Sequence, residues 1–150
     1  MQKYFFLTLV LFATAFFAQT ANAQTEAQRI DLCTRTAGAD ARFLQSYVIQ
    51  LDAARDGQRP PDTRNPVAFI KGNRYRITIC TDEESAGEAI IRLHDEGRSI
   101  ATNFEAASGR VITSLEFDCT KTAPYVIQTL SKDGRSAVSA VVIVSHVRTL

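Results

Sequence analysis

Apolar and polar residues alternate in short runs along most of the chain after residue 43. Ile77 and Ile79, for example, are separated by Thr78. Because successive side chains of a strand point to opposite faces of a sheet, this period of two predicts strands with one buried face. The pattern predicts about eight strands, at residues 43–51, 67–70, 75–80, 89–94, 99–104, 111–118, 125–130 and 137–147.

Turn-forming residues separate these strands. The segments 71–73, 95–97 and 132–134 each combine glycine with Asn or Asp, which is typical of tight turns. The last strand, 137–147, is apolar on both faces, as a strand in the centre of a sheet would be. Short strands with turn signals every 8–12 residues or so predict a mainly β fold, either a sandwich or a barrel.

A different period precedes the strands. Residues 25–37 have apolar positions at helical spacing, with Cys33 on the apolar face. Thr25 and Gln28 have the spacing of a capping box, and Gly38 is suited to a C-terminal cap. A helix this short is unstable alone, so we expect its apolar face to pack on the sheet.

Residues 1–23 have the features of a secretory signal peptide. Lys3 is their only charge, residues 4–18 are almost wholly apolar, and Ala21 and Ala23 give the small-x-small pattern of a cleavage site. We expect residues 24–150 to form a single secreted or periplasmic domain. An uncleaved anchor is the alternative, although the apolar stretch is shorter than the roughly 18 residues of a membrane span.

Charge excludes two classes of partner. The whole chain has 17 Lys and Arg against 16 Asp and Glu, and removal of residues 1–23 with Lys3 makes the rest formally neutral. A neutral chain has little electrostatic attraction for nucleic acid or anionic lipid. We therefore expect no nucleic-acid partner, and no membrane association after signal cleavage.

Several motifs occur in a recognisable order. They are the string Phe117-x-Cys119-x-Lys121-Thr122-x-x-Tyr125, preceded by Tyr75-Arg76-Ile77 and Asp95-x-Gly97 and followed by Asp133-Gly134 before a Val-rich strand. This order resembles an uncharacterised group of small secreted bacterial β-sandwich proteins. More remotely, it is similar to pre-peptidase C-terminal-type domains. The resemblance implies an antiparallel, jelly-roll-like sandwich and an exported protein, but no reaction. It also implies that Ser139 stands where the group tends to carry a fourth cysteine.

Three cysteines permit at most one intramolecular disulfide in an oxidising compartment. If every connection after Ile70 reverses the chain, Cys80 and Cys119 lie at opposite ends of the sandwich, too far apart to bond. The same reasoning places the helix entry near Cys119. We therefore predict a Cys33–Cys119 disulfide and a free thiol at Cys80, with another pairing or no bridge as alternatives.

Reactive groups are few. Cys80 could act as a nucleophile with His94 or His146 as its base, and the two histidines could bind a metal, but no spacing brings them together. A semi-buried structural thiol and solvated surface histidines are the ordinary interpretation. A candidate calcium site lies in the acidic loop, and its residues are Asp82, Glu83, Glu84 and Glu88.

Other carboxylate pairs, Glu116 with Asp118 and Asp95 with Glu96, have the character of solvated strand and turn positions. The loop with Arg55, Arg59 and Arg64 is interrupted by acids. It is either a plain crossover between sheets or a partner-binding loop.

We therefore expect a non-catalytic binding or accessory module with a protein or glycan partner, and no cofactor. The alternatives are an assembly subunit that pairs through an edge strand, and a small metal- or thiol-dependent hydrolase.

Overall fold

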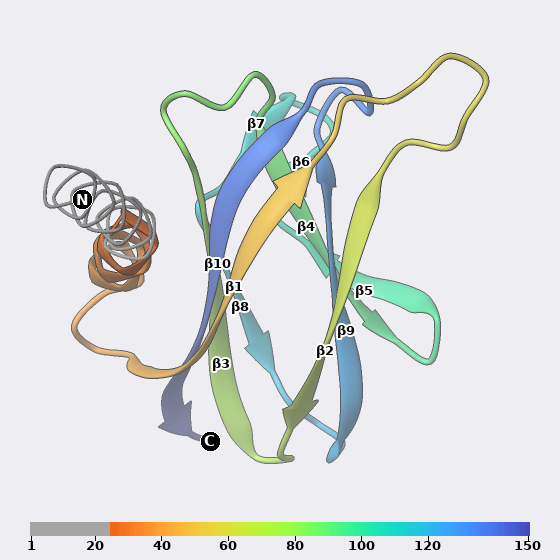
Figure 1. The fold of residues 1–150 in the computed structure, drawn as a ribbon. Helices are drawn as coiled ribbons and strands as arrows, with labels where there is room; N and C mark the ends of the chain where they lie inside the picture. Colours follow the sequence, from red (N-terminus) through yellow and green to blue (C-terminus); the bar gives the residue numbers. More distant parts are fainter. Residues whose placement is uncertain (1–24) are drawn as a thin grey trace, which may run out of the picture.

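Two antiparallel sheets of four strands pack face to face in the computed structural model, which describes residues 25–150 (Figure 1). The predicted signal peptide lies outside the described residues. The first sheet has the order β1-β10-β3-β8 and the second β2-β9-β4-β5. The strands are β1 (Arg42–Leu51), β2 (Asp62–Phe69), β3 (Asn73–Thr81), β4 (Ala89–Asp95), β5 (Arg98–Thr102), β6 (Phe104–Glu105), β7 (Arg110–Val111), β8 (Ser114–Asp118), β9 (Ala123–Ser131) and β10 (Val138–Thr149).

The chain passes from one sheet to the other at nearly every connection, and β4–β5 is the one hairpin within a main sheet of the described chain. This strand order is that of a jelly roll. The predicted mainly β, antiparallel sandwich with a short N-terminal helix is thus confirmed. Because of the crossings, loops from both sheets meet at each end of the sandwich.

The core lies between the sheets, where the alternate apolar residues of each strand meet. Ile77 and Val142 of the first sheet and Ile91 and Ile127 of the second are almost wholly buried. Full burial of such a side chain contributes about 1.5–3 kcal/mol. One end of the core is aromatic, where rings of the two sheets stack or tilt against one another at Phe69, Tyr75, Phe117 and Tyr125.

The Phe117–Tyr125 string builds the β8–β9 turn at this end. The Tyr125 hydroxyl donates to the Lys121 carbonyl at 3.0 Å, and the Cys119 thiol donates to the same oxygen. Thr122 accepts a hydrogen bond from the Lys71 amide of the neighbouring turn. Burial and the adjacent Cys119 thiol raise the pKa of Tyr125 to about 12. The motif therefore has a structural role at the aromatic end of the core.

Some strand boundaries differ from the prediction. The strand β2 begins at Asp62 rather than residue 67, because an edge strand tolerates Pro66. The predicted strands 99–104 and 111–118 are each interrupted. Asn103 causes this break, because its side chain accepts from the Ile91 amide and donates to the Ile112 carbonyl.

The helix, residues 25–36, packs on the outer face of the first sheet (Figure 1). Cys33 and Ala37 contact Val141 and Ile143 of β10, which are buried although they point away from the sandwich core. The strand β10 is therefore apolar on both faces because one face packs against the second sheet and the other packs against the helix. After the helix, Gly38 adopts a positive φ of 98°, which favours glycine.

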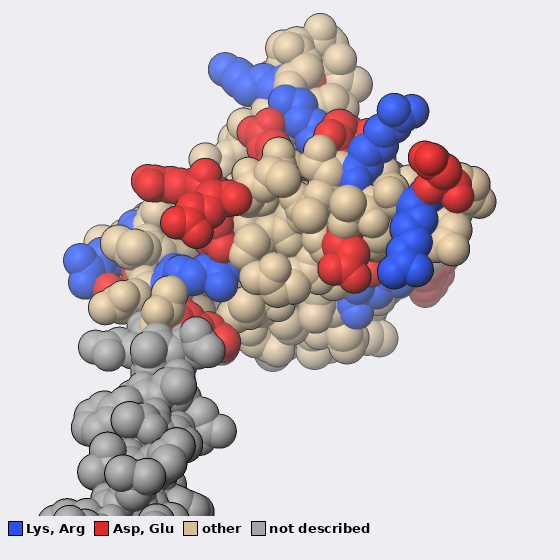
Figure 2. Space-filling model, turned by 45° about the horizontal axis from the view of Figure 1, so that its top comes forward, with Lys and Arg blue, Asp and Glu red and all other residues tan. Residues whose placement is uncertain are grey.

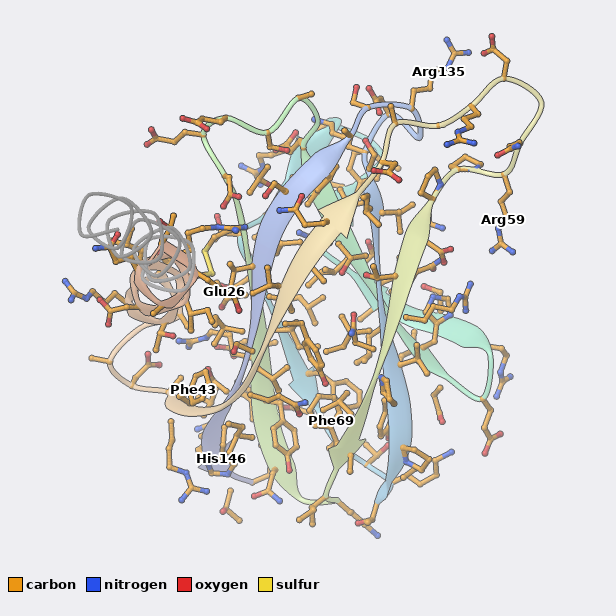
Figure 3. The ribbon with its side chains drawn as sticks, viewed as in Figure 1. Glu26, Phe43, Arg59, Phe69, Arg135 and His146 are labelled. Atoms are coloured by element: carbon orange, nitrogen blue, oxygen red, sulfur yellow. A yellow bond between two sulfur atoms is a disulfide. The ribbon has the colours of Figure 1, made fainter. Side chains whose placement is uncertain are left out.

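The disulfide prediction was wrong. Cys33 is bonded to Cys80, with Cα atoms 5.8 Å apart, and Figure 3 shows the disulfide as a yellow bond beside the helix. The free thiol is the buried Cys119. Strand alternation explains the pairing, because Ile79 points into the core and its neighbour Cys80 therefore points outward. The chain enters β1 near the Cys119 end, but residues 37–41 separate the helix from β1, and Figure 1 shows the helix beside the middle of the first sheet. Cys33 therefore lies over the outer face, where Cys80 points, and not at the Cys119 end.

Candidate functional site

An open groove of about 600 Å³ lies where the helix meets the β3–β4 loop on the outer face of the first sheet. One wall is the helix and the other is the loop, and the disulfide with Val141 forms the floor. The lining residues are Thr25, Arg29, Leu32, Cys33, Thr36, Cys80, Thr81, Asp82, Glu83, Glu84, Ser85, Ser139 and Val141.

The helix wall is a second stripe beside the buried one. Arg29, Leu32 and Thr36 recur at three- and four-residue spacing, which places them on one helical face. Leu32 is 63% exposed there. These residues were not predicted from the sequence, because they lie beside the apolar face that indicated the helix and not on it. The repeated spacing next to that face was the available signal.

An ionic clamp joins the two walls. The guanidinium of Arg29 donates Nε–H to Asp82 Oδ1 at 3.0 Å and places Nη2 2.6 Å from Oδ2. The same Nη2 also donates to the Ser139 hydroxyl at 3.1 Å. Both charged side chains are about one quarter exposed. A bidentate, partly buried pair of this kind fixes the helix against the loop.

Ser139 completes the clamp from the sheet. Its hydroxyl donates to Asp82 and accepts from Arg29 and from Gln50 Nε2 at 2.7 Å. The hydroxyl proton and both lone pairs are therefore engaged. The Ser85 hydroxyl also links two segments, because it donates to the Gly87 carbonyl and accepts one hydrogen bond, from the Ser139 amide. Both serines act as structural joints.

The loop that forms the second wall is anchored along β10. The Asp82 amide donates to the Ser139 carbonyl, and the Gly87 amide donates to the Ala137 carbonyl. A Cβ atom at Gly87 would lie 2.7 Å from the Cβ of Ser136, so glycine permits this close approach. The loop is therefore a fixed wall.

The four candidate calcium ligands are not brought together. Asp82 is paired with Arg29, and Glu88 is paired with Lys132 at 2.8 Å. Glu83 and Glu84 are exposed on the rim of the groove, where Figure 2 shows acidic side chains gathered on this side of the molecule. Within residues 25–150, no group of three or more His, Cys, Asp or Glu could hold a metal ion.

The other predicted reactive residues are also separated. His94 lies on the second sheet with its Nε2 2.9 Å from Gln128 Oε1, whereas His146 lies on the first sheet beside Asn73. The sulfur of Cys80 is part of the disulfide and offers no thiol. The thiol-dependent alternative that used Cys80 is therefore wrong.

The carboxylates of β8 are ion-paired rather than simply solvated. Arg74 contacts Asp118 at 2.5 Å and Glu116 at 3.5 Å, and Arg76 contacts Glu116 at 2.6 Å. The hydrogen bond from Arg74 lowers the pKa of Asp118 below its usual value. Arg76 also donates to the Ala37 carbonyl and to Asp40, so this network fastens the end of the helix to the sheet.

A smaller cleft of about 300 Å³ lies between the β1–β2 loop and the β9–β10 turn. Arg55 and Arg135 line it, and the Ala54 amide donates to the Arg135 carbonyl. Figure 3 shows Arg59 and Arg135 at this end of the molecule, beside the projecting loop. Arg64 belongs instead to β2, where it pairs with Asp62.

No protein-family model matches the chain, and no curated protein matches it. Among solved structures, the chain is similar to PliG of Aeromonas hydrophila, a periplasmic lysozyme inhibitor of g-type lysozyme. The two are 12% identical over 71% of this chain and 87% of that chain, with a TM-score of 0.47. The resemblances to small secreted β-sandwich proteins and to pre-peptidase C-terminal-type domains stay predictions. In the described part of the chain, no helix is long and apolar enough to span a membrane.

Proposed function

We propose that this protein is a non-catalytic binding module that acts outside the cytoplasm and takes its partner in the helix groove. The observation that carries the proposal is that interactions within the protein hold the groove in shape. A disulfide, a bidentate ion pair and the hydrogen bonds of Ser139 link its floor and walls. A preformed concave site loses little conformational entropy when a partner binds.

The chemistry of the groove supports binding rather than catalysis. A nucleophilic serine needs a base that can take its proton. The hydroxyl of Ser139 does contact a carboxylate, but both oxygens of Asp82 are already bound by the guanidinium of Arg29. The arrangement is that of a joint between the helix and the sheet.

A protein is a better partner than a glycan. The groove lining contains no aromatic residue among the described residues, whereas sugars are commonly held on aromatic faces. The aromatic rings of Phe69, Tyr75 and Tyr125 are buried in the core instead. A volume of about 600 Å³ can accept a few side chains of a protein segment.

The compartment is proposed on two grounds. The disulfide favours an oxidising environment, and residues 1–23 have the pattern of a signal peptide.

The assembly alternative has one feature in its favour. Phe43 and Leu44 are about 44% and 43% exposed at the start of the edge strand β1. A β-bulge interrupts the strand between Phe43 and Gln45, and bulges oppose edge-to-edge pairing. We therefore place this alternative second.

Site-specific crosslinking in cells tests the proposed function. A photo-crosslinking amino acid is placed at Leu32 in the groove or, as a control, at Ile100, which is 46% exposed on β5. We expect a discrete adduct from position 32 only. The further substitution Thr36→Trp fills the groove without touching the clamp, and should remove the adduct. Equal adducts at both positions, or adducts that persist with Thr36→Trp, would contradict the proposal.

A further inference from the structure

We propose that the groove binds a basic segment of a protein partner, with an aliphatic side chain on the floor and Lys or Arg side chains at the Glu83–Glu84 rim. This inference rests on the proposed function and names the chemistry of its ligand.

The floor of the groove selects an apolar group. Val141 and the Cys33–Cys80 disulfide form its base, and the exposed side chain of Leu32 forms part of the helix wall. Leu32 is nearly two-thirds exposed beside this concave surface. Contact with an apolar side chain of a ligand would lower the free energy of binding, because both side chains would lose contact with water. An aliphatic side chain of a peptide fits this surface.

The rim selects positive charge. The lining carries three carboxylates and one guanidinium, a formal charge of −2. Arg29 is engaged by Asp82, so the excess belongs to Glu83 and Glu84, which form no ion pair with any residue of the described chain. Two adjacent carboxylates above an apolar floor attract a ligand that carries an ammonium or guanidinium group on an aliphatic stem.

The β1–β2 loop, which lies at the same end of the sandwich as the groove, differs from the Glu83–Glu84 rim. The β1–β2 loop also has two exposed acids, Asp52 and Asp56, but Arg55 lies between them and lines the smaller cleft with Arg135. The loop therefore lacks a net acidic character and an apolar floor. It provides a matched control, because neutralising Asp52 and Asp56 changes the net charge of the protein as much as neutralising Glu83 and Glu84.

The occupant is taken from another molecule. An extended segment with alternating basic and aliphatic side chains matches both features of the groove, since neighbouring side chains then reach the rim and the floor together.

Peptide binding to the purified protein tests this inference. The probes are three fluorescein-labelled eight-residue peptides that share two leucines and differ at three positions, which are Lys, Gln or Glu. Fluorescence anisotropy measures the dissociation constants for the native protein, for Glu83→Gln with Glu84→Gln, for Asp52→Asn with Asp56→Asn, and for Leu32→Ser. The native protein and the three variants are each measured at low and at high salt.

We expect the Lys peptide to bind most tightly and the Glu peptide least. The Glu83→Gln, Glu84→Gln protein should bind the Lys peptide about five- to tenfold more weakly, whereas the matched Asp52, Asp56 control should stay within about twofold. Leu32→Ser should weaken binding of the Lys and Gln peptides alike, because it removes the apolar contact. High salt should reduce the difference between the Lys and Gln peptides.

Three results would overturn the inference: equal affinity for the Lys and Gln peptides, equal loss in the two charge variants, or no binding of any peptide. The proposed function is judged separately, because the Leu32 crosslink does not depend on ligand charge. A crosslink that Thr36→Trp removes, together with any of these three results, would retain the binding module and reject a basic ligand.

Discussion

The two sheets have similar inner faces but different outer faces. On the first sheet, Val141 and Ile143 point outward and are covered by the helix. The second sheet instead carries a polar ladder across three strands, in which His94 contacts Gln128 and Gln128 contacts Asp62. Both faces belong to one sandwich and both carry apolar residues, since Ile90 of β4 is also buried outside the core cluster. Within the described chain, however, the first sheet is the one whose outer face is covered by a helix.

This difference explains why a candidate site forms on the first sheet. The apolar outer face of the first sheet is covered by the helix. The groove lies along one side of this helix, so its floor is part of the same apolar face. A polar outer face is satisfied by water and by its own ladder. The disulfide and the ionic clamp then fix the helix in place. If this account is correct, changes under the helix should cost much more stability than matched changes on the second sheet.

Removal of the disulfide is expected to cause the largest loss in the free energy of unfolding. Replacement of both Cys33 and Cys80 by Ala removes a crosslink between residues 47 apart, and the chain-entropy estimate gives a loss of about 4 kcal/mol in the free energy of unfolding. Urea unfolding measures it. Cys119→Ala is the control, because it removes the free thiol and leaves the crosslink. A double variant as stable as that control would show that the helix is held without the disulfide.

The second test compares the apolar positions themselves. Ile143→Ala, under the helix, should lower the free energy of unfolding by about 3 kcal/mol, since a cavity forms at a fully buried site. Val126→Ala, on the half-buried outer face of the second sheet, should lower it by less than about 1 kcal/mol. Thermal or urea unfolding of both variants gives the difference. Equal losses would remove the distinction between the two faces.

The sequence predicted the elements better than it predicted their contacts. Alternation from β1 to β10 indicated the sandwich, because a period of two directly reports a buried face. The residues around Cys33 and Gly38 likewise indicated the helix and its end. These features depend on local spacing, which a single sequence contains.

The disulfide and the groove depended on which face the helix covers. The alternation of Ile79 and Cys80, together with the two apolar faces of β10, already indicated an outward cysteine beside an outward apolar patch. Chain direction reports at which end of the sandwich a residue lies but not which face it occupies, so it favoured Cys119 as the partner of Cys33. The clamp of Arg29 with Asp82 could not be predicted, because it joins residues 53 apart through a tertiary contact.

The third test compares two ion pairs of the same kind. Arg29→Gln breaks the clamp with Asp82, where both side chains are about one quarter exposed, and should lower the free energy of unfolding by about 1–2 kcal/mol. Arg64→Gln breaks the pair with Asp62 on the second sheet, where Arg64 is half exposed, and should change it by less than about 0.5 kcal/mol. Urea unfolding at low salt measures both. A larger loss for Arg64→Gln would indicate that the helix does not depend on its clamp.

The smallest expected effect is a loss of stability at low pH through Asp40. The hydrogen bond from Arg76 holds the pKa of Asp40 below its usual value of 3.8, at the point where the chain leaves the helix for β1. A carboxyl whose pKa is lower in the folded state stabilises the fold above its unfolded pKa, and this contribution is lost as the pH falls through the folded pKa. Asp40→Asn removes the charge at every pH. The native protein should therefore unfold at a slightly higher temperature than Asp40→Asn near pH 6.

This gap in unfolding temperature should close as the pH falls below about 4, since protonation makes the native side chain resemble the variant. Thermal unfolding of both proteins between pH 6 and pH 2 measures the gap. Ser46→Ala, which lies on the same outer face and does not titrate, should show a gap that stays constant over this range. A constant gap for Asp40→Asn as well would mean that the end of the helix is held by the Arg76 contact with the Ala37 carbonyl and not by the Asp40 charge.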